Sequence, residues 1–107
     1  MSSEAVEDEV FKALANGTRR RLLDALKQAP QTTGALCEAF PDIDRCTVMQ
    51  HLKVLESARL VLVTREGRER WNHLNAMPIQ EINDRWISQY AGHAMSVLGA
   101  LQAELGG

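Results

Sequence analysis

Hydrophobic residues recur at helical spacing along the first part of the chain. Val6, Val10 and Leu14 lie four positions apart, so one face of a helix over residues 4–15 is apolar. A leucine-rich pattern with arginine and lysine on the opposite side predicts a second helix over residues 18–28. An Asn-Gly pair separates the two segments and a proline follows the second, and both are common helix ends. The chain therefore opens with two amphipathic helices.

Two further helices, joined by a short turn, are predicted in the middle of the chain. Thr33 is placed to cap a short helix over residues 34–40, and Asp44 to cap a longer one over residues 45–58. In the longer helix, valine and leucine fall on one face and polar residues on the opposite one. Two helices joined by a tight turn, the second with a polar outer face, predict a helix-turn-helix.

The period of the pattern then changes to that of β-strands. Residues 60–64, Leu-Val-Leu-Val-Thr, predict a strand, and the alternating residues 69–74 predict its hairpin partner. Glu66-Gly67 lies between them and indicates a turn, either tight or slightly longer. A helix followed by a hairpin with a basic tip is the layout of a winged helix-turn-helix. We therefore expect a mainly α fold in which four helices precede a small β-hairpin and one helix follows it.

The last predicted helix, over residues 78–104, carries an apolar stripe about seven turns long. A domain of this size cannot cover so much apolar surface alone, and an exposed stripe of this length usually meets a partner. The simplest partner is a second copy, which gives a two-fold dimer. The stripe consists of Ile79, Ile82, Trp86, Tyr90, Val97, Leu101 and Leu105, with Ala94 between, and its residues from Ile79 to Leu101, Ala94 excepted, are assigned to the dimer interface.

Length and charge refine this picture. The 107 residues suffice for a single domain, 1–107, with residues 78–104 as its C-terminal dimerisation helix. The net charge of −2 alone argues against a nucleic-acid-binding protein. The distribution reverses that argument, because residues 1–15 carry three excess negative charges and residues 45–73 carry three excess positive ones. A local basic patch can bind phosphates while the rest of the molecule is acidic.

Several classes of protein are excluded at this stage. The chain has no apolar run long enough to span a membrane and no signal-peptide pattern, so a cytoplasmic location is expected. Its two cysteines, Cys37 and Cys46, are expected to be reduced. There is no nucleophile–base motif, glycine-rich phosphate loop or recognisable carboxylate pair, so no enzyme activity and no cofactor are predicted.

The predicted DNA-binding residues lie on the longer central helix and the hairpin. Gln50 has the groups for paired hydrogen bonds to adenine, and Lys53 for guanine or phosphate. The hydroxyl and methyl groups of Thr47 suit a phosphate or a thymine methyl group. His51 is expected to pack or to touch phosphate, and Met49 to touch bases or the turn. The arginines expected to meet phosphates or a minor groove are Arg45, Arg65, Arg68 and Arg70.

Three runs of sequence carry a resemblance to a known family. Residues 10–26, VFKALANGTRRRLLDAL, resemble the opening of ArsR-type winged-helix repressors. Residues 47–56, TVMQHLKVLE, resemble their recognition helix, and residues 60–71, LVLVTREGRERW, resemble their wing. The resemblance covers about residues 8–104 and keeps the order and spacing of the family. Gly17 stands where the family usually has proline.

The resemblance implies a homodimeric transcriptional regulator, usually a repressor, joined through its first and last helices. It therefore adds Val6 and Val10 to the predicted dimer interface. Met49 stands where the family usually has serine. Residues 71–75, Trp-Asn-His-Leu-Asn, resemble a branch whose members often lack metal sites.

The family's metal-binding motifs are incomplete in this chain. A Cys-x-Cys pair would require a second cysteine after Cys37, but Ala39 stands there. An Asp-x-His motif on the last helix would follow Asp84, but Trp86 occupies the histidine position. No tetrahedral set of ligands can be assembled from one segment, so no metal site is predicted.

Two alternatives to a plain DNA-binding repressor remain open. Cys37 and Cys46 could form a metalloid- or thiol-responsive switch within the same family. Alternatively, the chain could be a winged-helix protein-interaction module whose wing charges are merely solvated. The predicted partners of the favoured reading are double-stranded DNA and a second copy of the chain, without a membrane and without a named inducer.

Overall fold

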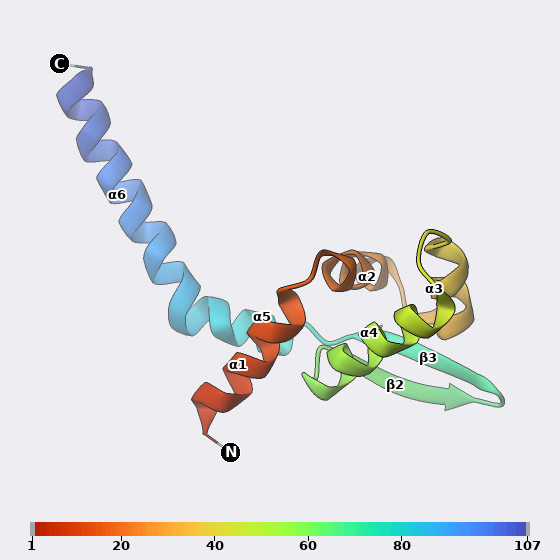
Figure 1. Ribbon diagram of the computed structural model, residues 1–107. Helices are drawn as coiled ribbons and strands as arrows, with labels where there is room; N and C mark the ends of the chain where they lie inside the picture. The colour runs from red at the N-terminus through yellow and green to blue at the C-terminus, as the bar shows by residue number, and fades with distance from the viewer. Residues whose placement is uncertain (1, 107) are drawn as a thin grey trace.

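The computed structural model describes residues 2–106, and it has the expected winged helix-turn-helix order (Figure 1). A small three-stranded antiparallel sheet lies against the helices of the N-terminal two thirds of the chain, and the C-terminal helix leaves this body. The elements are α1 (Ser3–Leu14), α2 (Gly17–Gln28), β1 (Gln31–Thr32), α3 (Thr33–Ala39), α4 (Arg45–Ser57), β2 (Val61–Glu66), β3 (Glu69–Leu74), α5 (Met77–Ile82), the π-helical turn η1 (Asn83–Ile87) and α6 (Ser88–Leu105).

Capping side chains fix where the two helices of the helix-turn-helix begin. The Asp44 carboxylate accepts a hydrogen bond from the amide of Cys46, at 3.1 Å, so the predicted cap of α4 is confirmed. The cap of α3 is Thr32, whose hydroxyl accepts from the amide of Ala35 at 3.1 Å. The prediction of Thr33 is wrong by one residue, because Thr33 already has helical geometry.

The end of α4 explains why β2 begins one residue later than predicted. Arg59 has a positive φ of 64°, and its amide donates to the Glu56 carbonyl at 3.0 Å. The amide of Leu60 donates to the Leu55 carbonyl at 2.9 Å, and both leucines are buried. These two bonds and the apolar contact form a Schellman motif, with arginine where glycine is usual. Leu60 therefore belongs to the helix end rather than to the strand.

The sheet contains one strand that the sequence pattern did not predict. The short strand β1 pairs with β3, so that the order is β1-β3-β2. The β2–β3 hairpin, hereafter the wing, closes through two residues, Gly67 and Arg68, with Glu66 opposite Glu69. Gly67 has a φ of +62°, which fits glycine at the first central position of a tight hairpin turn. The tight alternative is therefore the observed one.

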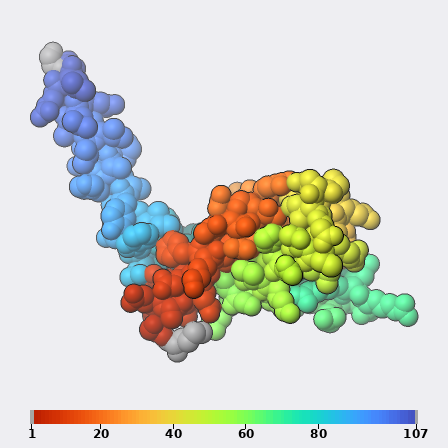
Figure 2. Space-filling view, in the orientation of Figure 1, coloured from red at the N-terminus to blue at the C-terminus, as the bar shows by residue number. Residues whose placement is uncertain are grey.

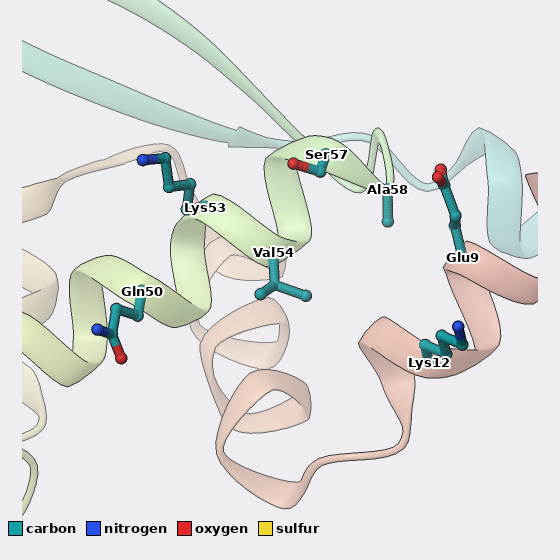
Figure 3. Close-up of a pocket in the computed structure, with 7 residues that line it drawn as sticks. All are labelled: Glu9, Lys12, Gln50, Lys53, Val54, Ser57 and Ala58. Carbon is teal, nitrogen blue, oxygen red and sulfur yellow. The ribbon is translucent and has the colours of Figure 1, made fainter.

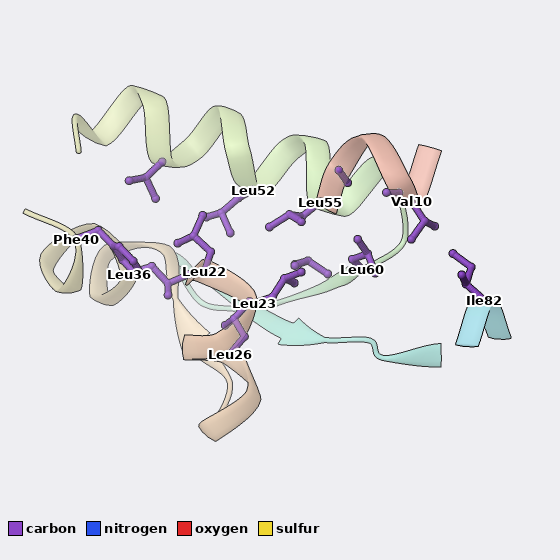
Figure 4. Close-up of a cluster of buried hydrophobic side chains, with 14 residues drawn as sticks. Val10, Leu22, Leu23, Leu26, Leu36, Phe40, Leu52, Leu55, Leu60 and Ile82 are labelled. Atoms are coloured by element: carbon purple, nitrogen blue, oxygen red, sulfur yellow. The ribbon is translucent and has the colours of Figure 1, made fainter. Parts of the chain in front are cut away.

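One hydrophobic core joins the helices to the base of the wing (Figure 4). Leucines of α2 and α4 form its centre, and each fully buried leucine contributes about 1.5–3 kcal/mol of transfer free energy. Val10 and Ile82, at 1% and 4% exposure, are also part of this core. Their assignment to the dimer interface is therefore wrong, because their side chains have no surface left for a partner. The core consists of Val10, Ala13, Leu22, Leu23, Leu26, Leu36, Phe40, Val48, Leu52, Leu55, Ala58, Leu60, Val61 and Ile82.

The C-terminal segment departs from the single helix predicted over residues 78–104. It begins as α5, widens into η1, and continues as α6, which projects away from the body (Figures 1 and 2). Residues 83–105, hereafter the arm, are exposed throughout their length. The arm stretches the molecule to 65 × 35 × 21 Å.

Among the described helices, none combines the length and the apolar composition that crossing a bilayer requires.

Candidate nucleic-acid interface

Helix α4 turns one face to the core and the opposite face to solvent. Val48, Leu52 and Leu55 are buried, because residues three and four apart share a side of a helix. Gln50 and Lys53 are exposed on the outer side. The side chains that read a base edge must project from such a face, because the major groove admits one helix. Both residues are therefore placed where the sequence predicted.

The N-terminal half of α4 adds further predicted residues to this surface. Arg45, in the first turn, is exposed, and Met49 is 50% exposed. Thr47 is half-buried, so only part of its side chain reaches the surface. A groove of about 390 Å³ lies between α4, the start of α3 and Arg70 of β3. Its lining residues are Thr33, Cys46, Met49, Gln50, Leu52, Lys53, Glu56 and Arg70.

The wing arginines occupy two different environments. Arg68 is exposed in the two-residue turn, as the prediction of a phosphate contact requires. Arg65 is also exposed, near the end of β2. Arg70 is half-buried, and its guanidinium donates to the carboxylate of Glu56 on α4. Arg70 therefore ties the wing to α4 and is not free at the wing tip, which corrects its predicted placement.

A second groove lies between α1 and the outer face of α4 (Figure 3). Its volume is about 610 Å³, and Lys12 of α1 lies on its wall opposite Gln50 and Lys53 of α4. Sequence reasoning missed Lys12, because it treated the first helix only as an acidic, apolar-faced element. The available signal was that Lys12 is the sole basic residue among the first 15. The groove is completed by Glu9, Val54, Ser57 and Ala58.

His51 is occupied within the protein rather than open to DNA. It is half-buried on α4, and its Nδ1 lies 3.2 Å from Nη1 of Arg19 on α2. Burial first, and then the positive charge of Arg19, lower the pKa of His51 below its ordinary value of 6.5. Of the two roles predicted for His51, the structure shows packing. Sequence reasoning missed Arg19 as the partner of His51, because the two residues are 32 positions apart and no local pattern joins them.

The two cysteines do not form part of a recognisable metal centre. Cys37 is half-buried on α3, where it packs against the core, and Cys46 is exposed in the first turn of α4. Within residues 2–106, no group of three histidine, cysteine, aspartate or glutamate residues is arranged to hold a metal ion.

The predicted dimerisation residues divide between body and arm. Trp86, Tyr90, Val97 and Leu101 are large apolar side chains on the arm that remain 42–54% exposed. Trp86 packs edge-on against Phe11 of α1, with ring centroids 5.8 Å apart, and against Tyr90 at 5.2 Å. Val6 and Ile79 are half-buried.

An ion pair also connects α1 to the arm. The guanidinium of Arg85 in η1 donates two hydrogen bonds to the carboxylate of Glu7. The hydrogen bond from Arg85 lowers the pKa of Glu7. This pair holds the base of the arm against α1.

The fold and this surface define a class of protein. A helix-turn-helix whose second helix exposes polar side chains, followed by a cationic hairpin, is a winged helix-turn-helix DNA-binding domain. A family model described as a helix-turn-helix domain matches residues 14–64.

Known proteins extend the match beyond the helix-turn-helix. The chain is 35% identical over 101 residues to the HTH-type transcriptional regulator Rv2034 of Mycobacterium tuberculosis, covering 91% of this chain and 94% of that protein. It is 34% identical over 74 residues to the transcriptional repressor SdpR of Bacillus subtilis, covering 69% and 81%. The crystal structure of an ArsR family transcriptional regulator superposes with a TM-score of 0.75 at 25% identity, covering 89% of this chain and 96% of that one. The chain belongs to the ArsR-type winged helix-turn-helix family and is a DNA-binding transcriptional regulator.

Proposed function

We propose that the chain is a homodimeric repressor that reads a pseudo-palindromic operator through α4 and the wing. The observation that carries this proposal is the combination of an exposed polar face on α4 with an apolar arm that one chain leaves uncovered. Two copies related by a two-fold axis present two copies of α4, and the half-sites are then about 34 Å apart.

The contacts that we propose fall into two groups. Gln50 and Lys53 read base edges from the outer face of α4, with Thr47 and Met49 beside them. Exposed arginines at the start of α4 and on the wing hold the phosphate backbone and set the register of the protein on the duplex. These arginines are Arg45, Arg65 and Arg68.

The composition of the arm supports a second copy as its partner. Apart from His93, Glu104 is the only acidic or basic residue in 88–105, although that helix is exposed throughout. An apolar surface of this kind, rimmed by the polar body, marks a protein–protein contact. A two-fold axis would bring the same stripe of each copy together, so that the apolar face of one copy covers that of the other.

Repression is the mode of action that a relative supports. SdpR is named a transcriptional repressor, and its similarity to this chain extends over 74 residues. A dimer seated on a promoter would exclude RNA polymerase from the same DNA, without further chemistry.

A footprint on the protein's own promoter region, repeated at increasing salt, tests the proposal. We expect two protected half-sites related by a dyad, and an affinity that falls steeply with salt as phosphate counterions are released. A reporter gene behind that promoter should be expressed more strongly when the regulator is removed. No footprint, or an affinity indifferent to salt, would instead support a protein-interaction module.

A further inference from the structure

Arg19 joins the carboxyl end of α1 to α4. Its Nε donates to the carbonyl of Ala13 at 2.7 Å, and Nη2 donates to the carbonyl of Lys12 at 3.0 Å. Its Nη1 lies 3.2 Å from Nδ1 of His51 on α4. The amide of Arg19 is itself held by the side chain of Asn16, at 3.1 Å. One planar guanidinium therefore binds two carbonyls in the last turn of α1, of which that of Lys12 also accepts from the Ala15 amide, and one ring on another helix.

The chemistry of this contact fixes the proton on His51. A guanidinium has only donors, so Nδ1 of His51 must be the acceptor and its proton must lie on Nε2. Protonation of Nδ1 would remove the acceptor and set an imidazolium against the guanidinium. Burial of the ring and the charge of Arg19 both lower the pKa of His51, so the ring is neutral at neutral pH.

We propose that Arg19 and His51 are positioning residues for DNA binding: their bond fixes the rotation of α4 against α1, and protonation of His51 releases it. Gln50 directly precedes His51 on α4. A rotation of α4 that moves the ring of His51 therefore also moves the side chain of Gln50, which we propose faces the major groove of DNA. The inference rests on the proposed role of α4 as the DNA-reading helix. Operator affinity should therefore decrease in mild acid.

Other charged groups near α4 lie on the elements that pack against it, which are α1, α2, α3 and β2. On α1, Glu9 and Lys12 line the groove beside Lys53. Arg19 of α2 is the charge that lowers the pKa of His51. The ionisable residues of α3 and β2 are Cys37, Glu38, Arg65 and Glu66.

The sign of the pH dependence separates positioning from direct contact. A histidine that touched phosphate would bind DNA more tightly when protonated, because its new charge would face the backbone. A histidine that positions α4 through Nδ1 would lose its bond and weaken binding. The two roles therefore predict opposite slopes over the same pH range.

The test uses a labelled duplex selected by the wild-type protein from a randomised pool. We expect wild-type affinity to be steady near neutral pH and to fall as the pH drops below 6.5, because the pKa of His51 is lowered, by about 5-fold or more as is typical of coupling between sites. His51→Asn should abolish that fall, because its carboxamide oxygen can replace Nδ1 as an acceptor that does not titrate. His93→Asn, on the exposed arm, is the matched control and should keep the wild-type pH dependence.

Further variants keep the test decisive if His51→Asn folds poorly by circular dichroism. Arg19→Lys retains the charge but has one ammonium group in place of the three-way fork, so it should weaken binding at neutral pH and flatten the pH profile. An affinity that rises in acid, or the same fall in His51→Asn as in the wild type, would overturn the inference. Gln50→Ala distinguishes failure of the underlying function: if it leaves sequence preference unchanged, α4 is not the reading helix.

Discussion

Arg65 lies directly opposite Arg70 in the pairing of β2 with β3, and the next pair along the wing is Glu66 with Glu69. Opposed residues share a face of the sheet and successive pairs alternate, so the arginines occupy one face and the glutamates the other. The arginine face is the one toward α4, because Arg70 binds Glu56 there. Like charges directly opposed destabilise a hairpin, so placing two cations on this face of the wing lowers its stability.

Removing one of these cations should therefore increase the stability of the protein and decrease its affinity for DNA. We expect Arg65→Thr to raise the free energy of unfolding by about 0.2–1 kcal/mol, because it removes the repulsion between Arg65 and Arg70. Threonine is chosen because it suits a β-strand. The same change should weaken DNA binding and reduce the salt slope by about 1. Urea unfolding and affinity measured over a range of sodium chloride concentrations give the two quantities.

Glu66→Thr is the matched control, because it relieves the opposite pair without removing a cation. It should stabilise the wing by a similar amount and leave DNA affinity undiminished. Equal losses of affinity in the two variants would show that the arginine face has no special relation to DNA.

Gln50 and Arg68 should differ in how their loss affects different DNA sequences. Gln50→Ala is expected to cost about 1–3 kcal/mol at one base position and to relax preference there, since it removes paired hydrogen bonds to a base. Arg68→Ala should weaken all duplexes alike, because a phosphate contact carries no sequence information. Binding to a panel of single-base operator variants measures both, and a uniform loss in Gln50→Ala would contradict the groove assignment.

The left-handed residue at the end of α4 offers a stability prediction. Arg59→Gly should raise the free energy of unfolding by roughly 0.5–1 kcal/mol. Glycine relieves the strain of positive φ, although its greater freedom in the unfolded chain offsets part of the gain. Arg59→Ala keeps the strain and removes only the exposed side chain, so its thermal midpoint should stay near that of the wild type. A midpoint raised equally by alanine would assign the effect to the side chain.

The apolar stripe of the arm leads to a prediction about the oligomeric state of the protein. Trp86→Glu should convert a dimer into monomers, because it places a charge on the apolar stripe while leaving the core of the body intact. Sedimentation velocity measures the mass, and circular dichroism shows whether the body remains folded. Met95→Glu is the control: Met95 is 70% exposed and lies off the stripe of Tyr90, Val97 and Leu101, so this variant should stay dimeric. A folded dimer of Trp86→Glu would exclude the arm as the interface.

Local patterns predicted most of the fold, because most of its elements are determined by neighbouring residues. The strand over residues 69–74 has the predicted bounds, and α4 begins where Asp44 caps it. Strand β1 escaped prediction because two residues have no measurable period and their pairing, Gln31 with Asn72, is made across the chain. The buried side chain of Asn72 likewise donates to the Gln31 carbonyl and the Thr33 hydroxyl, contacts that no local pattern encodes.

In the candidate site, too, local patterns predicted some features and missed those that depend on contacts between distant residues. The outward direction of Gln50 and Lys53 follows from helix geometry, whereas the contacts of Arg70 and His51 depend on side chains from other elements. The spacing of apolar residues along a helix also does not predict which surface covers them. Ile82 satisfies the same spacing as the arm residues and is nevertheless buried in its own chain.

The π-helical turn η1 lies between the buried Ile82 and the exposed apolar residues of α6. Ile82 precedes this turn, whereas Tyr90, Val97 and Leu101 follow it. A π-helical turn holds one residue more than an α-helical turn, and one residue corresponds to about 100° of rotation. Ile82 and Trp86 therefore lie against the body, whereas the helix beyond η1 presents its apolar side in a different direction from that of an uninterrupted α-helix. Insertion or deletion of a single residue in η1 would thus redirect the arm and, in the dimer that we propose, change the spacing of the operator half-sites while leaving every proposed DNA-contacting side chain unchanged.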